Sequence, residues 1–255
     1  SQAEEAGSHI EEGLKALGAQ DYGAASELFS NAFEEGAADG AFYLGRMLEL
    51  GFGTEPNLQA AVGLYIAGSA KGSPPSKNRL GVLHVQGVGV LQDYELGAKL
   101  VCEAADLGDM NGAFNCASLL LEGRGAEQDE AAAYRWFEKA SDLGHLGARN
   151  AFANALIEGK YVAQDLDKAV QLFQQTAAAG NPVGLFSLGQ AFATGLGVDQ
   201  DAVKAHSYFN LAAALSHPEA AAARAALEQH MTAEEVKLAQ QRAKAWRPAQ
   251  AEATN

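Results

Sequence analysis

Seven polar side chains are the best candidates for binding a ligand, and they lie along the helices that we expect to open successive sequence repeats. They are one phenol, two guanidinium groups, three amides and one hydroxyl: Tyr43, Arg46, Arg79, Asn115, Ser118, Asn154 and Gln190. Amides and hydroxyls can hydrogen-bond the backbone of an extended peptide, and arginines can bind a carboxylate. The alternative interpretation is a solvated polar face without a ligand.

Residue types that support catalysis or metal binding occur, but not in suitable groups. The histidines show no pair three or four residues apart and no compact set with cysteine; they are His9, His84, His145, His206, His217 and His230. We therefore expect no metal site. No serine lies in a nucleophile elbow, and carboxylates such as Glu127 and Asp129 fall at expected helix caps and outer faces. We predict a protein that is not an enzyme and that uses no cofactor.

A glycine-rich turn occurs five times along the chain. The five turns are Gly51-Phe-Gly53, Gly87-Val-Gly89, Gly123-Arg-Gly125, Gly159-Lys-Tyr161 and Gly195-Leu-Gly197. Each follows an expected helix rather than a strand, which argues against a phosphate-binding loop. Glycine instead supplies the left-handed backbone that ends a helix. Because Tyr161 replaces the second glycine, we expect the fourth turn to differ slightly.

These turns belong to a sequence period of 36 residues. A closing glycine recurs at the same interval, and so does a capping residue before the second helix of each pair: Asp21, Asn57, Asp93, Asp129, Asp165 and Asp201. A carboxylate or amide at that position satisfies free backbone N–H groups. Each first helix also carries a large-small pair such as Leu44-Gly45, whose small member lets neighbouring helices approach closely. A fixed period of this length indicates a repeat architecture.

We therefore predict an all-α chain of about seven antiparallel helix pairs with 36-residue repeats. The expected segments are a tetratricopeptide-like helix pair at 1–36, five repeats at 37–216, capping helices at 217–247 and a disordered tail at 248–255.

Composition limits the partners. The chain has 255 residues and a net charge of −14, which disfavours nucleic acid and anionic membrane surfaces because both need a cationic face. No apolar run approaches the roughly 20 residues that span a bilayer, so we expect a soluble protein.

The two cysteines leave two possibilities open. Cys102 and Cys116 lie symmetrically about residue 109, so antiparallel packing could bring them together. Comparison of the repeats instead places Cys116 at a core position and Cys102 where Glu138, Gln174 and Asn210 stand. We favour two unpaired thiols, one buried and one partly exposed. A disulfide requires an oxidising compartment.

The repeat pattern resembles the Sel-1-like repeat family, which is related to tetratricopeptide repeats. The best-matching stretches are LGQAFATGLGVDQDAVKAHSYFNLAAA at 188–214 and LLLEGRGAEQDEAAAYRWFEKASDLG at 119–144, and the resemblance covers residues 21 to about 216. It implies a right-handed α-solenoid, mostly bacterial and often secreted or periplasmic, that binds proteins on its concave face. A branch of the family with two cysteines in each repeat is not matched here.

On this basis we expect a bacterial protein–protein interaction scaffold or adaptor that binds a protein or peptide on its concave face. We expect a monomer or weak oligomer in the periplasm or secreted, with the cytoplasm as the alternative. The alternative function is binding of a small molecule or a cell-wall glycan fragment. That function needs exposed aromatic rings on the groove, and Tyr43, Phe42, Phe114 and Phe186 are the candidates.

Overall fold

The computed structural model describes residues 1–249, and these residues form fourteen α-helices and no strand. The predicted all-α fold class of about seven helix pairs is therefore confirmed. The helices are α1 (Gln2–Gly18), α2 (Tyr22–Glu34), α3 (Asp39–Leu50), α4 (Leu58–Ala70), α5 (Pro74–Gln86), α6 (Tyr94–Asp106), α7 (Met110–Glu122), α8 (Glu130–Asp142), α9 (Leu146–Glu158), α10 (Leu166–Ala178), α11 (Pro182–Thr194), α12 (Ala202–Ala214), α13 (Ala220–Glu228) and α14 (Ala233–Ala245).

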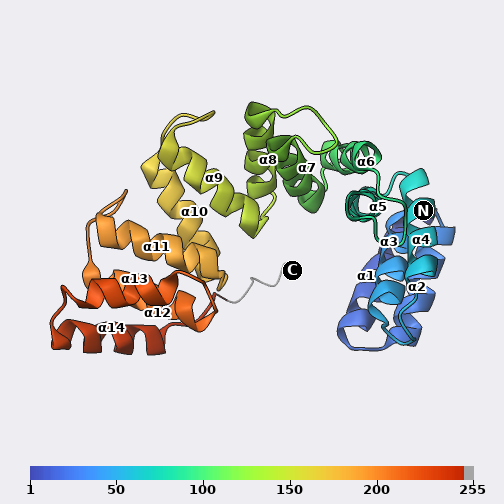
Figure 1. Ribbon diagram of the computed structural model, residues 1–255. Coiled ribbons are helices and arrows are strands. Elements are labelled where there is room, and N and C mark those ends of the chain that lie inside the picture. The colour runs from blue at the N-terminus through green and yellow to red at the C-terminus, as the bar shows by residue number, and fades with distance from the viewer. Residues whose placement is uncertain (250–255) are drawn as a thin grey trace. The chain divides into compact units, whose positions relative to one another are not determined.

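The chain divides into two compact units, Ser1–Lys139 and Ala140–Asn255. In the first unit, each helix from α1 to α7 packs against the next (Figure 1). The first helices of successive pairs, α3, α5 and α7, also contact one another in that order. In the second unit, α9 to α12 pack in sequence, and both α13 and α14 pack on α12.

Helix boundaries follow the capping signals. The predicted caps all accept a hydrogen bond from the backbone N–H three residues ahead: Asp21, Asn57, Asp93, Asp129, Asp165 and Asp201. The first glycine of each turn has a positive φ, from 66° to 75° at Gly51, Gly123, Gly159 and Gly195. Each segment between these signals therefore forms one helix of a pair.

The glycines of the large-small pairs lie where the partner helix approaches closely, as predicted. A methyl group added at Gly45 would lie 2.5 Å from the Tyr65 ring, and one added at Gly189 would lie 2.7 Å from the Phe209 ring. Glycine at these positions therefore allows the second helix of the pair to bring its aromatic residue against the first.

The second glycine of the turn has a different role, because it touches the preceding repeat. A Cβ at Gly125 would lie 2.0 Å from the Tyr94 carbonyl oxygen at the start of α6, and a Cβ at Gly197 would lie 2.8 Å from the Leu166 oxygen of α10. Tyr161, which replaces this glycine in the fourth turn, keeps the same left-handed backbone with φ 65°. The expected difference of the fourth turn is therefore not seen in the backbone of this residue, because the repeat imposes the left-handed conformation even without glycine.

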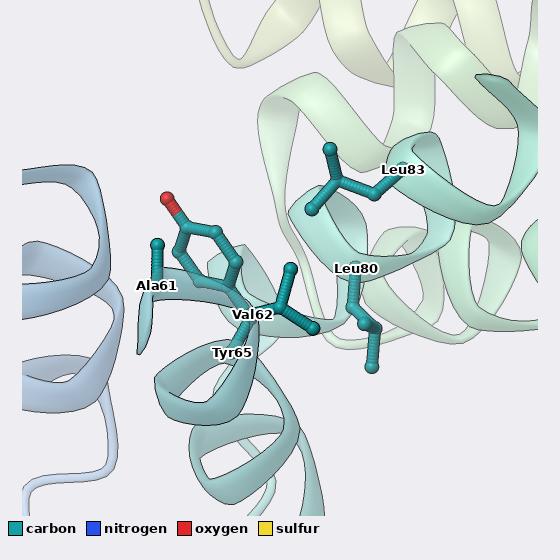
Figure 2. Close-up of a cluster of buried hydrophobic side chains, with 5 residues drawn as sticks. All are labelled: Ala61, Val62, Tyr65, Leu80 and Leu83. Atoms are coloured by element: carbon teal, nitrogen blue, oxygen red, sulfur yellow. The ribbon is translucent and has the colours of Figure 1, made fainter. Parts of the chain in front are cut away.

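Figure 2 shows a core cluster between α4 and α5 in the first unit, formed by Ala61, Val62, Tyr65, Leu80 and Leu83. Burial of apolar surface of this kind is the main stabilising contribution in a repeat stack. Tyr65 is fully buried, and its hydroxyl reaches beyond the cluster to Glu49 of α3. The core of one pair is therefore joined to the polar residues of its first helix.

The two cysteines form a disulfide, so the favoured prediction of two unpaired thiols is wrong. Cys102 of α6 and Cys116 of α7 have Cα atoms 5.0 Å apart and sulfur atoms 2.07 Å apart. Their helices are antiparallel and meet at residue 109, so residues equally far from that turn face each other. The geometry of this one hairpin therefore predicts the pairing better than the residues found at the equivalent positions of the other repeats.

The C-terminal region packs on the last repeat. His206 of α12 is fully buried, and its Nε2 lies 2.6 Å from a carboxylate oxygen of Glu228 in α13. Farther on, the N–H of Ala249 donates to the carbonyl of Ala178, so residue 249 of the predicted tail contacts α10. The remainder of that prediction, residues 250–255, lies outside the described residues.

Candidate functional site

A polar pocket of about 320 Å³ lies in the first unit where the first helices of three successive pairs meet. Its lining comes from α3, α5, α7 and the residue that caps α7: Phe42, Arg46, Pro75, Asn78, Arg79, Val82, Asp109, Asn111 and Asn115. Because the repeat places α3, α5 and α7 side by side, equivalent positions of the three helices form rows across the pocket.

Glu49 holds the two arginines of the pocket. Its carboxylate accepts hydrogen bonds from Arg46 at 2.9 Å, from the Nε of Arg79 at 3.1 Å and from the Tyr65 hydroxyl at 2.6 Å, and a second Arg79 nitrogen binds its other oxygen. Burial alone would raise the pKa of Glu49, but the Arg79 and Tyr65 hydrogen bonds and the two positive charges outweigh it and lower this pKa to about 2. Burial, followed by the hydrogen bond to Glu49 and the negative charge of that residue, raises the pKa of Tyr65. Two guanidinium groups thus share one carboxylate.

The lining also contains a negatively charged residue, Asp109, which lies immediately before α7. One of its oxygens accepts from the N–H of Gly112 at 2.6 Å, which caps α7. Burial, followed by the negative charge of Asp39, raises the pKa of Asp109 despite that hydrogen bond. Burial and the charges of Asp39 and Asp109 also raise the pKa of Tyr43. Asp109 thus contributes a negative charge to the lining of the pocket.

The structure brings three of the seven predicted site residues into this pocket, namely Arg46, Arg79 and Asn115. The Asn115 amide donates to Asn78, so these two amides form a pair across α5 and α7. Tyr43 is half-buried instead and stacks on Phe29 with ring centroids 4.9 Å apart. The Ser118 hydroxyl donates to the Phe114 carbonyl one turn earlier, as serine often does within helices.

The remaining two predicted residues, Asn154 of α9 and Gln190 of α11, lie in the second unit and are exposed. The predicted ladder of amides therefore includes residues of both units. Its role in binding stays a prediction.

Sequence reasoning missed Glu49, Asn78, Asp109 and Asn111. For Glu49 a signal existed, because it follows Arg46 by three residues on one helix, a spacing that lets opposite charges pair. Asp109 gave no clear signal, since a cap at the start of a first helix looks the same whether or not it lines a pocket.

The four aromatic rings that are candidates for a glycan site are buried or half-buried. Phe186 is 8% exposed and packs on Phe209 and His217. Phe42 and Phe114 are half-buried, as is Tyr43. Phe42 also lines the polar pocket, but none of the four rings is fully exposed, which limits the surface on which a sugar could stack.

None of the helices within residues 1–249 has the length and apolar character needed to cross a membrane.

Comparison with protein families identifies five matches to the Sel1 repeat, at residues 38–73, 74–109, 111–145, 150–181 and 182–217. The matches cover more than half of the chain and agree with the predicted family resemblance. No curated protein matches the chain significantly.

Solved structures support the same fold. The chain is 26% identical to c5321, described as a protective antigen of uropathogenic Escherichia coli with an SLR fold, with a TM-score of 0.75. That match covers 87% of this chain and 48% of the other, so the chain spans about half the length of the antigen structure. A Sel1 repeat protein from Oxalobacter formigenes is 19% identical with a TM-score of 0.73, covering 95% of this chain and 99% of that one.

Proposed function

This chain belongs to the Sel1 repeat family, and from that premise we propose that it is a non-enzymatic adaptor that holds a protein or peptide partner against α3, α5 and α7. Sel1 repeat proteins are generally interaction scaffolds rather than enzymes. The first helices form the concave face of the solenoid in this proposal, and the polar pocket is the anchoring point for the partner.

The observation that carries this proposal is the convergence of Arg46, Arg79 and Asn115 in one pocket beside Asn78. Their side chains come from helices that the repeat places side by side, so a partner lying across the helices would contact all of them. Amides can bond a peptide backbone, and guanidinium groups that Glu49 already orients can bind a carboxylate with little loss of side-chain entropy.

We also propose a periplasmic or secreted location in a bacterium. The support is the Cys102–Cys116 disulfide, because such bonds persist mainly in oxidising compartments.

An affinity capture from the envelope and cytosolic fractions of the native host tests both proposals. The baits are the intact chain, the double variant Arg46→Gln/Asn115→Ala and the control Lys99→Gln, which removes a positive charge from an exposed site on α6. We expect one envelope protein to be recovered by the intact chain and the control, and at least tenfold less by the double variant.

Equal recovery by all three baits would contradict the pocket as the anchoring point. A partner found only in the cytosolic fraction would contradict the proposed compartment. If no protein were recovered and cell-wall fragments bound instead, the adaptor function would be wrong.

A further inference from the structure

The polar pocket has charges of opposite sign at its two ends, and this arrangement restricts what it can bind. Asp109 and Asp39 lie at the N-terminal ends of α7 and α3, which we call the negative end, whereas Arg46 and Arg79 lie one to two turns farther along α3 and α5 and form the positive end. Three amides of the lining, Asn78, Asn111 and Asn115, come from the same two helices, α5 and α7.

The positive end retains binding capacity after its internal contacts are counted. Glu49 neutralises one of the two guanidinium charges, so the group of three keeps one net positive charge. Arg46 uses one nitrogen on Glu49, and Arg79 uses two. Each guanidinium carries five N–H donors, so both keep donors for a further acceptor. A single carboxylate would satisfy the surplus charge and these donors.

The negative end lacks a counter-charge. Asp109 caps α7 with one oxygen, and no lysine, arginine or histidine pairs with it in the described part of the chain. Its neighbour Asp39 accepts a hydrogen bond from the Ser73 hydroxyl, which brings no positive charge. A cationic group entering this end would relieve the repulsion between the two carboxylates.

The repeat gives an approximate distance between the ends. Arg79 and Asn115 are 36 residues apart and therefore occupy equivalent positions in α5 and α7. Asp109 precedes Asn115 by six residues, which corresponds to about 9 Å along a helix axis. Two or three residues of extended chain span this distance at about 3.3 Å each. The pocket volume of about 320 Å³ lies at the lower end for ligand sites, which suits a chain end.

We propose that this pocket binds the free carboxyl terminus of a peptide with a lysine or arginine at the second or third position from its end. The terminal carboxylate binds Arg46 and Arg79, the basic side chain pairs with Asp109, and the asparagine amides bond the peptide groups between them. This inference rests on the proposed function, since it specifies the partner chemistry of the same pocket. It also makes Glu49 a positioning residue, because it orients both guanidinium groups.

Calorimetric titration of the full chain with the probe acetyl-Ala-Ala-Lys-Ala, bearing a free carboxyl terminus, tests the proposal. A second peptide has an amidated terminus, and a third has norleucine in place of lysine. A fourth, acetyl-Ala-Glu-Lys-Ala amide, offers a side-chain carboxylate only. We expect the free-acid lysine peptide to bind at least tenfold more tightly than each of the other three.

Matched variants assign each charge to its end of the pocket. Arg46→Gln leaves the Arg79–Glu49 contacts in place, and Asp109→Asn retains a good helix cap. The controls are Lys99→Gln and Asp93→Asn, the second of which alters the cap of α6 outside the pocket. We expect each pocket variant to weaken binding of the probe at least tenfold and each control to change it less than twofold.

The sharpest test combines each pocket variant with the peptide that lacks the group bound by the mutated residue. Arg46→Gln should not weaken the amidated peptide further, and Asp109→Asn should not weaken the norleucine peptide further. Equal affinity for free-acid and amidated peptides would overturn the proposal, and tight binding of the side-chain carboxylate peptide would overturn the choice of a chain terminus. Failure of all four peptides, with a partner still captured through the pocket, would refute this inference alone. Absence of any captured partner, with the probe bound as expected, would refute only the adaptor function.

Discussion

At the scale of single residues, Glu49 determines the properties of the pocket. It lies on α3, is 13% exposed in its side chain, and joins two arginines from successive first helices to the buried Tyr65 of α4. Hydrogen bonds to charged groups typically contribute about 1.5–3 kcal/mol each when a partner is removed. The same residue therefore supports both stability and the geometry of the site.

Substitution Glu49→Gln should lower the free energy of unfolding by about 2 kcal/mol at pH 7. The pKa of Glu49 is lowered from its ordinary value of 4.5 to about 2 in the folded chain, so the charged form stabilises the fold above pH 4.5. This contribution is lost as the pH falls from about 4.5 to about 2. Urea unfolding at several pH values measures it.

The control for this experiment is Glu95→Gln, at an exposed carboxylate of α6. It should change the free energy of unfolding by less than about 0.5 kcal/mol at every pH measured. A difference between wild type and Glu49→Gln that stays constant from pH 7 to pH 3 would contradict the assigned role of the charge.

At the scale of elements, each turn joins two helices and also contacts the preceding pair. The first glycine ends a helix, whereas the second lies against the start of the preceding second helix, as Gly125 does against Tyr94. The period of the sequence therefore encodes contacts within a pair and between pairs at once. This explains why a Gly-x-Gly motif without any phosphate recurs along the chain.

Substitution Gly125→Ala should cost about 2 kcal/mol more than Gly123→Ala in the same turn. Both glycines have positive φ, 76° and 66°, so both variants incur backbone strain. The added methyl lies 2.0 Å from a backbone oxygen at Gly125, but 3.1 Å from the Gln128 Cβ at Gly123. Equilibrium unfolding of both variants measures the difference, and equal costs would mean that the second glycine does not seat the turn.

The α6–α7 hairpin is crosslinked by a disulfide that closes a loop of 14 residues. Reduction should lower the free energy of unfolding of the first unit by about 3 kcal/mol, the magnitude associated with loops of this size. Thermal unfolding with and without a reductant measures the change, with thiol labelling to verify the redox state. If the double variant Cys102→Ser/Cys116→Ala were as stable as the oxidised chain, the crosslink would have no stabilising role.

At the scale of the whole molecule, the features predicted correctly are those that the period repeats. Five copies of the same pattern specify the helix pairs, the capping residues and the small residues at which neighbouring helices approach closely. A feature that occurs once is invisible to this reasoning. The Cys102–Cys116 pair depends on one hairpin, and comparison with other repeats pointed to the wrong environment.

The same limit explains the partial prediction of the site. Arg46, Arg79 and Asn115 were found because equivalent faces of successive first helices can be read from the period. The spacing of Arg46 and Glu49 offered a signal, but Glu49 also contacts Tyr65 and Arg79, which lie 16 and 30 residues away in sequence, and the period does not reveal such contacts. The charges of a pocket depend on such individual pairings.

The central claim is that a partner binds the pocket between α3, α5 and α7. Site-specific photo-crosslinking in the native host tests it most directly, with a benzophenone side chain placed at Val82 inside the pocket or at Lys99 on exposed α6. We predict a single crosslinked protein from the Val82 position, attached through its C-terminal peptide, and none from Lys99. Crosslinking of that partner from Lys99 but not from Val82 would contradict the account.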